Sequence, residues 1–238
     1  MKKVFIPLIV GLMGLSLNAQ KVIEKNLDHK GQAIEVDVKF ASDIQVLTWD
    51  RPTVYFKAEI TTKDGKFLDL YQLNVEQNDK TIKIAPEVNE LFKAIHRERE
   101  GKDSDRGVHL MDGDYEFHYV LQVPKNSKFK IGSINGNLKA ELIEGDFTAE
   151  LINGDIEIEE YSGDMDLRTI NGEIDLVMRD TKLEAETIHG SIYVDDTLEL
   201  KVIDRIVGQK VEGSFDRATH RLKLNTINGN LYLRKEGR

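Results

Sequence analysis

Four carboxylates in the middle of the chain are the side chains best placed to do chemistry. They are Asp155, Glu157, Asp164 and Asp166. Clustered carboxylates cleave polysaccharides when one acts as an acid and another as a base or nucleophile. A sugar substrate also needs aromatic rings to stack on, and Tyr161 and Tyr193 lie nearby in the sequence. A polysaccharide-cleaving β-solenoid is therefore one hypothesis for this chain.

Calcium binding is the second chemistry that these oxygens suggest, because a calcium site needs several carboxylate or carbonyl ligands. Calcium-binding nonapeptide β-rolls repeat the motif GGxGxDxUx. Here each nine-residue phrase keeps at most one glycine, and no aspartate stands two residues after it. A calcium-binding β-roll is therefore an alternative that the motif itself does not favour.

Other signatures of catalysis are missing from the sequence. It has no nucleophile elbow, HExxH motif or Walker loop. The absence of cysteine excludes a disulfide framework, thiol catalysis and a lipid-bearing cysteine. Each acidic residue is better explained as the solvated surface of a repeat. We predict a protein that is not an enzyme, with no catalytic residue, no metal site and no cofactor.

A nine-residue phrase repeats over residues 134–208 and organises the chain. The phrases are INGNLKAEL from Ile134, IEGDFTAEL from Ile143, INGDIEIEE from Ile152, YSGDMDLRT from Tyr161, INGEIDLVM from Ile170, RDTKLEAET from Arg179 and IHGSIYVDD from Ile188. They agree best at a spacing of eighteen residues, and the Ile206 triplet still keeps that spacing. A short fixed period of this kind indicates a solenoid.

Within the phrase, apolar positions 1, 5 and 7 alternate with polar positions 4, 6 and 8, which is the period of a half-buried strand. Positions 2 and 3 are mostly a polar residue and glycine, typical of a tight turn with positive φ. We predict one strand and one turn per phrase, coils of eighteen residues, and coils stacked about 4.8 Å apart in parallel register. The isoleucine at position 1 is predicted to be core.

The turn residues are predicted to form a structural ladder, because stacked asparagines hydrogen-bond along the axis. They are Asn135, Gly136, Asn153, Gly154, Asn171, Gly172, His189, Gly190, Asn228 and Gly229. In this prediction His189 stacks on Asn171, and the late strand at Asn228 caps one end.

Acidic columns are also expected on the outer faces. They pair Glu157 with Asp175, Asp146 with Asp164, and Asp166 with Glu184. Like charges one rung apart repel each other. A divalent cation, nearby lysine and arginine, or salt could offset this repulsion.

Three segments are predicted. Residues 1–19 form a signal peptide, with a basic start, an apolar stretch and a small residue at the cleavage site. Residues 20–124 form an N-terminal β half with one or two helical turns near Leu91 and a charged loop near 93–114. Residues 125–238 form the repeat half, continuous with the first. The loop could bind a partner or a cation through its aspartates, Asp103, Asp105, Asp112 and Asp114.

Loss of Lys2 and Lys3 with the signal peptide would take the formal charge from −9 to −11. An acidic protein has no electrostatic basis for binding nucleic acid or an anionic membrane. The apolar stretch is shorter than the roughly 20 residues that a spanning helix needs, so no stable membrane insertion is expected after cleavage. The export signal places the protein in the periplasm by preference, with the outer surface or secretion as alternatives.

The recurring I-N-G-(D/E/N)-(I/L)-x-(L/I/A), downstream of DIQVLTWDRPTV at residues 43–54, resembles the bacterial "putative adhesin" β-strand-repeat family. That family is related to the toast-rack and head-GIN domains, and the chain is similar to its Bacteroidetes-type members. The resemblance implies a β-solenoid-like fold in the cell envelope and supplies no catalytic residues. We predict an adhesin-like or envelope-stress-related protein that binds an envelope protein or glycan, with self-association as a further possibility.

Overall fold

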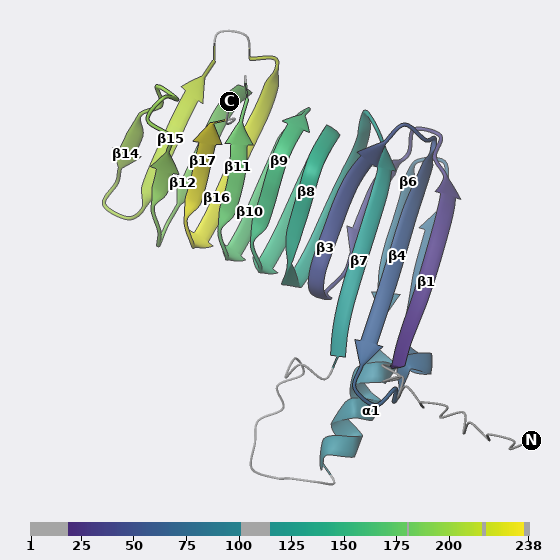
Figure 1. The fold of residues 1–238 in the computed structure, drawn as a ribbon. Coiled ribbons are helices and arrows are strands. Elements are labelled where there is room, and N and C mark those ends of the chain that lie inside the picture. Colours follow the sequence, from purple (N-terminus) through teal and green to yellow (C-terminus); the bar gives the residue numbers. More distant parts are fainter. Residues whose placement is uncertain (1–18, 101–114, 180, 216–217, 236–238) are drawn as a thin grey trace, which may run out of the picture.

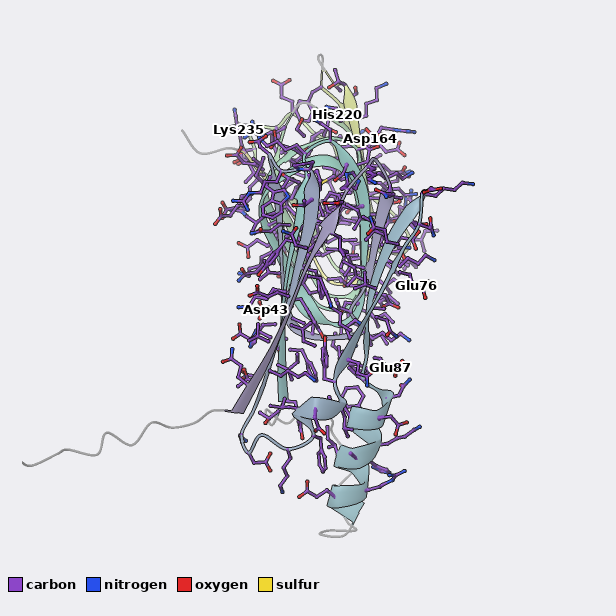
Figure 2. All side chains as sticks on the ribbon, turned by 90° about the vertical axis from the view of Figure 1, so that its right-hand side faces the viewer. Asp43, Glu76, Glu87, Asp164, His220 and Lys235 are labelled. Carbon is purple, nitrogen blue, oxygen red and sulfur yellow. The ribbon has the colours of Figure 1, made fainter. Side chains whose placement is uncertain are left out.

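Strands run across the molecule and stack along its length in two facing layers, as the computed structural model shows (Figure 1). It describes residues 19–100, 115–179, 181–215 and 218–235. Viewed at 90°, the two layers enclose a filling of side chains (Figure 2). The prediction of an all-β protein is confirmed. The strands belong to one large sheet, which bends from one layer into the other within the long strand β8 (Ser127–Asn153).

The order of the strands follows from their pairings. The first layer runs β1 (Ala19–Asp28), β4 (Thr53–Thr62), β7 (Tyr115–Pro124), β3 (Phe40–Trp49), the middle of β8, β9 (Ile156–Ser162), β11 (Ile174–Met178), β17 (Leu231–Lys235) and β13 (Ile192–Val194). The second layer runs β5 (Gln72–Gln77), β6 (Thr81–Glu87), β2 (Ala33–Asp37), the ends of β8, β10 (Met165–Asn171), β16 (His220–Asn228), β12 (Thr181–Thr187), β15 (Gln209–Ser214) and β14 (Val202–Asp204).

Alternation of residue types explains why these segments are strands. Along β4, Val54, Phe56, Ala58 and Ile60 are buried while the residues between them are half-buried. A strand directs successive side chains to opposite faces, so this spacing fills the space between the layers. The ring of Phe56 stacks on Tyr119 of β7 with centroids 5.7 Å apart.

A helix, α1 (Asn89–Glu100), and a short 3₁₀ turn, η1 (Leu68–Leu70), lie beneath the N-terminal half of the layers (Figures 1 and 2). Leu91 and Ile95 are buried, and Phe92 meets Phe40 edge to face at 4.7 Å. The helix is longer than the one or two turns predicted, because it continues through charged residues up to Glu100. The signal peptide and the loop aspartates, Asp103 to Asp114, lie outside the described residues. Among those described, no helix is both long and apolar enough to cross a membrane.

The eighteen-residue spacing sets the register in the first part of the repeat. Leu138 pairs with Ile156 and Ile156 with Ile174 in one layer, while Phe147 pairs with Met165 in the other. All of these pairings are parallel. A separation of eighteen residues between neighbours means that the chain returns to the same layer once every two phrases.

The register changes beyond Met178, where the last strands of the chain enter the stack. β16 lies between β10 and β12, and β17 lies between β11 and β13, all in parallel (Figure 1). The prediction that the coil at Ile188 stacks directly on the coil at Ile170 is therefore wrong. We call β16 and β17 together the inserted rung. The inserted rung buries its own apolar column, which consists of Leu222, Leu224, Leu231 and Leu233. It fills the stack instead of capping it.

The second layer ends with a hairpin that departs from the repeat. β15 pairs antiparallel with β12, and β14 pairs antiparallel with β15. The Ile206 triplet, which keeps the eighteen-residue spacing in the sequence, lies in the turn of this hairpin and not in a coil.

Candidate functional site

The four carboxylates that suggested polysaccharide cleavage are not brought together. Asp155 and Glu157 lie at β9 in one layer, whereas Asp164 and Asp166 lie at β10 in the other. All four have a partner of their own: Lys139 Nζ lies 2.7 Å from Glu157 and Arg168 Nη2 lies 2.6 Å from Asp166. The Asp155 carboxylate accepts from the backbone N–H of residue 173 at 2.8 Å. The Asp164 carboxylate accepts from the backbone N–H of residue 221 at 2.8 Å.

The acidic columns are interrupted by basic residues. Glu157 does stack on Asp175, and Arg234 of the inserted rung pairs with Asp175 at 2.5 Å. The predicted contact of Asp166 with Glu184 is wrong, because Lys223 of the inserted rung lies in register between these two positions. Opposite charges on neighbouring strands are stabilising. Within the ranges that the structure describes, no group of three or more His, Cys, Asp or Glu residues could hold a metal ion.

The asparagines of the turns form a hydrogen-bonded ladder along the stack. Asn153 Nδ2 donates to Asn135 Oδ1 at 3.0 Å, and Asn171 Nδ2 donates to Asn153 Oδ1 at 2.8 Å. The next rung is Asn228, whose Nδ2 donates to Asn171 Oδ1 at 2.7 Å. His189 therefore follows Asn228 and not Asn171, and its backbone N–H donates to the carbonyl of residue 227 at 2.7 Å.

The glycines beside the asparagines allow the turns to touch. A β-carbon on Gly154 would lie 2.1 Å from the carbonyl oxygen of Gly136, and one on Gly229 would lie 1.9 Å from that of Gly172. Positive φ was predicted for the whole column, but Gly136 has it and Gly154, Gly172, Gly190 and Gly229 do not. Most of the column therefore consists of glycine because the rungs approach closely.

Buried threonines line the inner side of these turns, a role that the repeat pattern did not predict. The hydroxyl of Thr169 donates to the carbonyl of Gly154, that of Thr226 to Gly172, and that of Thr187 to the glycine of the inserted rung, each at 2.9 Å. Because a buried carbonyl without a partner is costly, the threonines stabilise the turn from inside. Their signal in the sequence is a threonine directly before the Ile-Asn-Gly or Ile-His-Gly triplet.

The isoleucines of these triplets point outward, contrary to prediction. In the intervening phrases position 1 is core, as Ile143 and Tyr161 show. In the triplets the isoleucines are 39–40% exposed, and the inward position is taken by the residue before them. The exposed residues are Ile152, Ile170, Ile227 and Ile188. Because a strand has a period of two, a buried Thr169 requires its neighbour Ile170 to face solvent.

These isoleucines and the ladder residues beside them form a continuous exposed surface, which we call the strip. It consists of Ile152, Asn153, Ile170, Asn171, Ile227, Asn228, Ile188 and His189. None is Asp, Glu, Lys or Arg, although such residues make up 32% of the chain. A hollow of about 380 Å³ adjoins the isoleucines and is lined also by Arg168, Lys223, Asn225 and Glu186.

The turn between β14 and β15 lies beside the strip at Ile188. Ile206 is fully exposed at the apex of this turn, and the neighbouring Val207 is 58% exposed. The turn is fixed by a backbone hydrogen bond from Arg205 N–H to the Gly208 carbonyl at 3.0 Å. Gly208, with φ +76°, packs so closely that a β-carbon there would lie 2.9 Å from the α-carbon of Ile188.

Comparison with solved structures shows a likeness of fold. A "putative cell adhesion protein" from Clostridium sporogenes superposes with a TM-score of 0.59 at 9% identity, covering 91% of this chain and 100% of that one. A "putative lipid binding protein" from Parabacteroides distasonis reaches a TM-score of 0.38 at 12% identity, covering 74% of this chain and 70% of that one.

A "putative adhesin" from Parabacteroides merdae reaches a TM-score of 0.27 at 13% identity, covering 74% of this chain and 68% of that one. The sequence matches no protein-family model and no curated protein. At these identities the likeness concerns the fold, and only the first superposition is close enough to carry that argument. The chain therefore shares its fold with a bacterial protein named a "putative cell adhesion protein", in agreement with the sequence resemblance to the "putative adhesin" family.

Proposed function

We propose that this protein is a non-catalytic, exported protein of the bacterial cell envelope whose β-solenoid-like repeat presents the strip to a partner. The observation that carries the proposal is the strip itself, an exposed surface without charge on a chain that is one-third charged. The largest contiguous apolar patch on a soluble protein is often an interaction site. The partner we propose is a protein or glycan of the envelope, met in the periplasm or outside the cell.

The composition of the strip matches that of an interface centre. Such centres are depleted in charged residues and surrounded by a polar rim. Here Glu150, Arg168 and Glu186 lie on strands on one side of the strip, and Asp155 and Glu173 follow the turn on the other. Lys223 and Asn225 in the adjoining hollow make no side-chain hydrogen bond or ion pair within the described parts of the chain, and are thus available to a ligand.

The strip is also rigid, which lowers the entropic cost of binding. Each of its rungs is fixed by backbone pairing, and most by the asparagine ladder as well. Isoleucine is branched at Cβ and therefore populates few side-chain rotamers before binding. Preorganisation of this kind raises affinity without any new contact. The shared fold with a protein named a "putative cell adhesion protein" supports the same reading.

A capture experiment tests the proposal. Immobilised protein is incubated with envelope extract, and the wild type is compared with an Ile170→Asp, Ile227→Asp double variant. Both side chains are exposed, so the fold should persist, with some loss of thermal stability because the two aspartates stand side by side on neighbouring strands. Circular dichroism and a thermal melt would verify that the variant is folded at the temperature of the capture assay. Val22→Asp is the matched control, because Val22 is equally exposed on β1 at the far end of the molecule. Capture that survives the double variant would contradict the proposal.

A further inference from the structure

We propose that the partner of the strip is a second copy of this chain, with two strips packed face to face and antiparallel about a two-fold axis. This inference rests on the proposed function only in treating the strip as a contact surface. It names the occupant and the orientation, which are the two things that the surface leaves open.

The regular spacing of the strip isoleucines favours a partner with the same spacing. The isoleucines of the strip belong to successive parallel strands, so they recur about every 4.8 Å. A row of branched side chains with that spacing leaves gaps at the same spacing. An irregular partner can fill some of these gaps, but a partner with the same period fills all of them, as in the dry interfaces between paired β-sheets. A second copy of this chain has that period by construction.

The order of the isoleucines along the strip is compatible with a two-fold axis. Along the stack the exposed isoleucines of the strip follow the order Ile152, Ile170, Ile227 and Ile188. The midpoint of this row falls between Ile170 and Ile227. An antiparallel copy therefore sets Ile170 against Ile227 of the second copy and Ile152 against Ile188 of the second copy. An interface in which one patch meets itself in this way is isologous and closes at two copies.

The distribution of charge around the strip also suits contact between two copies. With a net charge of −9, two copies repel each other at long range. The strip removes charge from the point of contact, and the acids on one side of it, Glu150 and Glu186, are neutralised within each copy. Lys130 lies 2.6 Å from Glu150 and Arg205 lies 2.7 Å from Glu186. We therefore expect salt to strengthen the dimer, because salt screens the remaining repulsion while leaving apolar contact unaffected or stronger.

The absence of native cysteine allows the orientation to be tested directly. Ile152→Cys and Ile188→Cys variants of residues 20–238 are prepared separately and treated with a short bis-maleimide cross-linker. The antiparallel dimer predicts an abundant covalent dimer only when the two variants are mixed, and at least tenfold less with either alone. Val22→Cys mixed with either variant is the control. Cross-linking of each variant with itself would show a parallel arrangement and overturn the proposal.

Sedimentation of the unmodified protein supplies the second measurement. A monomer–dimer equilibrium that shifts toward monomer in the Ile170→Asp, Ile227→Asp variant supports the proposal, whereas a wild-type monomer at all concentrations overturns it. A monomer that binds zwitterionic phosphatidylcholine vesicles through the strip overturns it in favour of a lipid surface. Either of these failures leaves the proposed function standing if envelope capture still depends on the strip, so the two proposals can fail separately.

Discussion

Replacement of Gly229 by alanine should destabilise the protein, because the added methyl group has no room between the rungs. A β-carbon at this position would lie 1.9 Å from the carbonyl oxygen of Gly172, and real β-carbons essentially never approach closer than 3.0 Å. The inserted rung must therefore move away by about 1 Å. Neither partner can rotate aside, because the obstructing atom belongs to the backbone of β10 and the turn after it.

The magnitude follows from the hydrogen bonds that such a shift breaks. The N–H of Gly172 donates to the carbonyl of Asn228 at 3.1 Å, and the N–H of Ile174 donates to Asn230 at 3.0 Å. An increase of about 1 Å takes both beyond hydrogen-bonding distance. Each such bond contributes about 1 kcal/mol net, and a buried group left without a partner costs about 1–3 kcal/mol. We expect Gly229→Ala to lower the free energy of unfolding by about 2–4 kcal/mol.

Urea unfolding followed by circular dichroism measures this change as a shift of the midpoint at constant slope. Gly132→Ala is the matched control, because its β-carbon would have no neighbour nearer than 3.9 Å and its φ is not positive. At such a site alanine is neutral or stabilises by about 0.4–1 kcal/mol, through the unfolded state. If both variants unfold within about 0.5 kcal/mol of the wild type, the close approach of the turns is not what fixes glycine in this column.

Three further predictions concern side chains of the stack. Thr226→Val removes the donor to a turn carbonyl and should cost about 1–2 kcal/mol in the same urea assay, whereas Thr226→Ser should cost less. Lys223→Glu would align three acids on neighbouring strands, so its thermal midpoint should fall and recover partly in 0.5 M salt, unlike that of Lys223→Gln. Burial lowers the pKa of His118, but its contacts with Asp43 and Glu116 outweigh burial and raise it. Stability from this group should thus be full below about pH 6.5 and lost as pH rises through the raised pKa, and His118→Gln should abolish that dependence.

The strands and the first part of the register could be read from the sequence because two periods coincide there. The period of two identifies the strands, and the spacing of eighteen residues identifies which strands are neighbours, as for Leu138, Ile156 and Ile174. Both are local or periodic properties of the chain. They need no knowledge of how distant segments pack.

The orientation of the isoleucines could not be read in the same way, because the triplet offers two residues for one inward position. Thr169 and Ile170 are neighbours, and hydrophobicity alone places the isoleucine inside. The structure buries the threonine because the turn carbonyl beneath it needs a donor, which isoleucine lacks. At Ile170, Ile188 and Ile227, satisfaction of a backbone group therefore outweighs burial of one apolar side chain, and the displaced isoleucines face solvent. Before Ile152 the inward position is held by Leu151 instead, so the hydroxyl donor does not explain the first rung.

The inserted rung was likewise unpredictable from spacing, since Ile188 and Ile206 both keep the interval of eighteen residues. Spacing cannot reveal that the coil at Ile188 leaves room for one rung, which the triplet at Ile227 later fills. That rung determines the surface as well as the fold. Without it, Ile170 and Ile188 would face each other across two strand spacings of about 4.8 Å each, and the strip would be interrupted at its centre. Completion of the stack by β16 and β17 therefore creates a continuous strip, so any interaction through the strip requires these two strands to be in place.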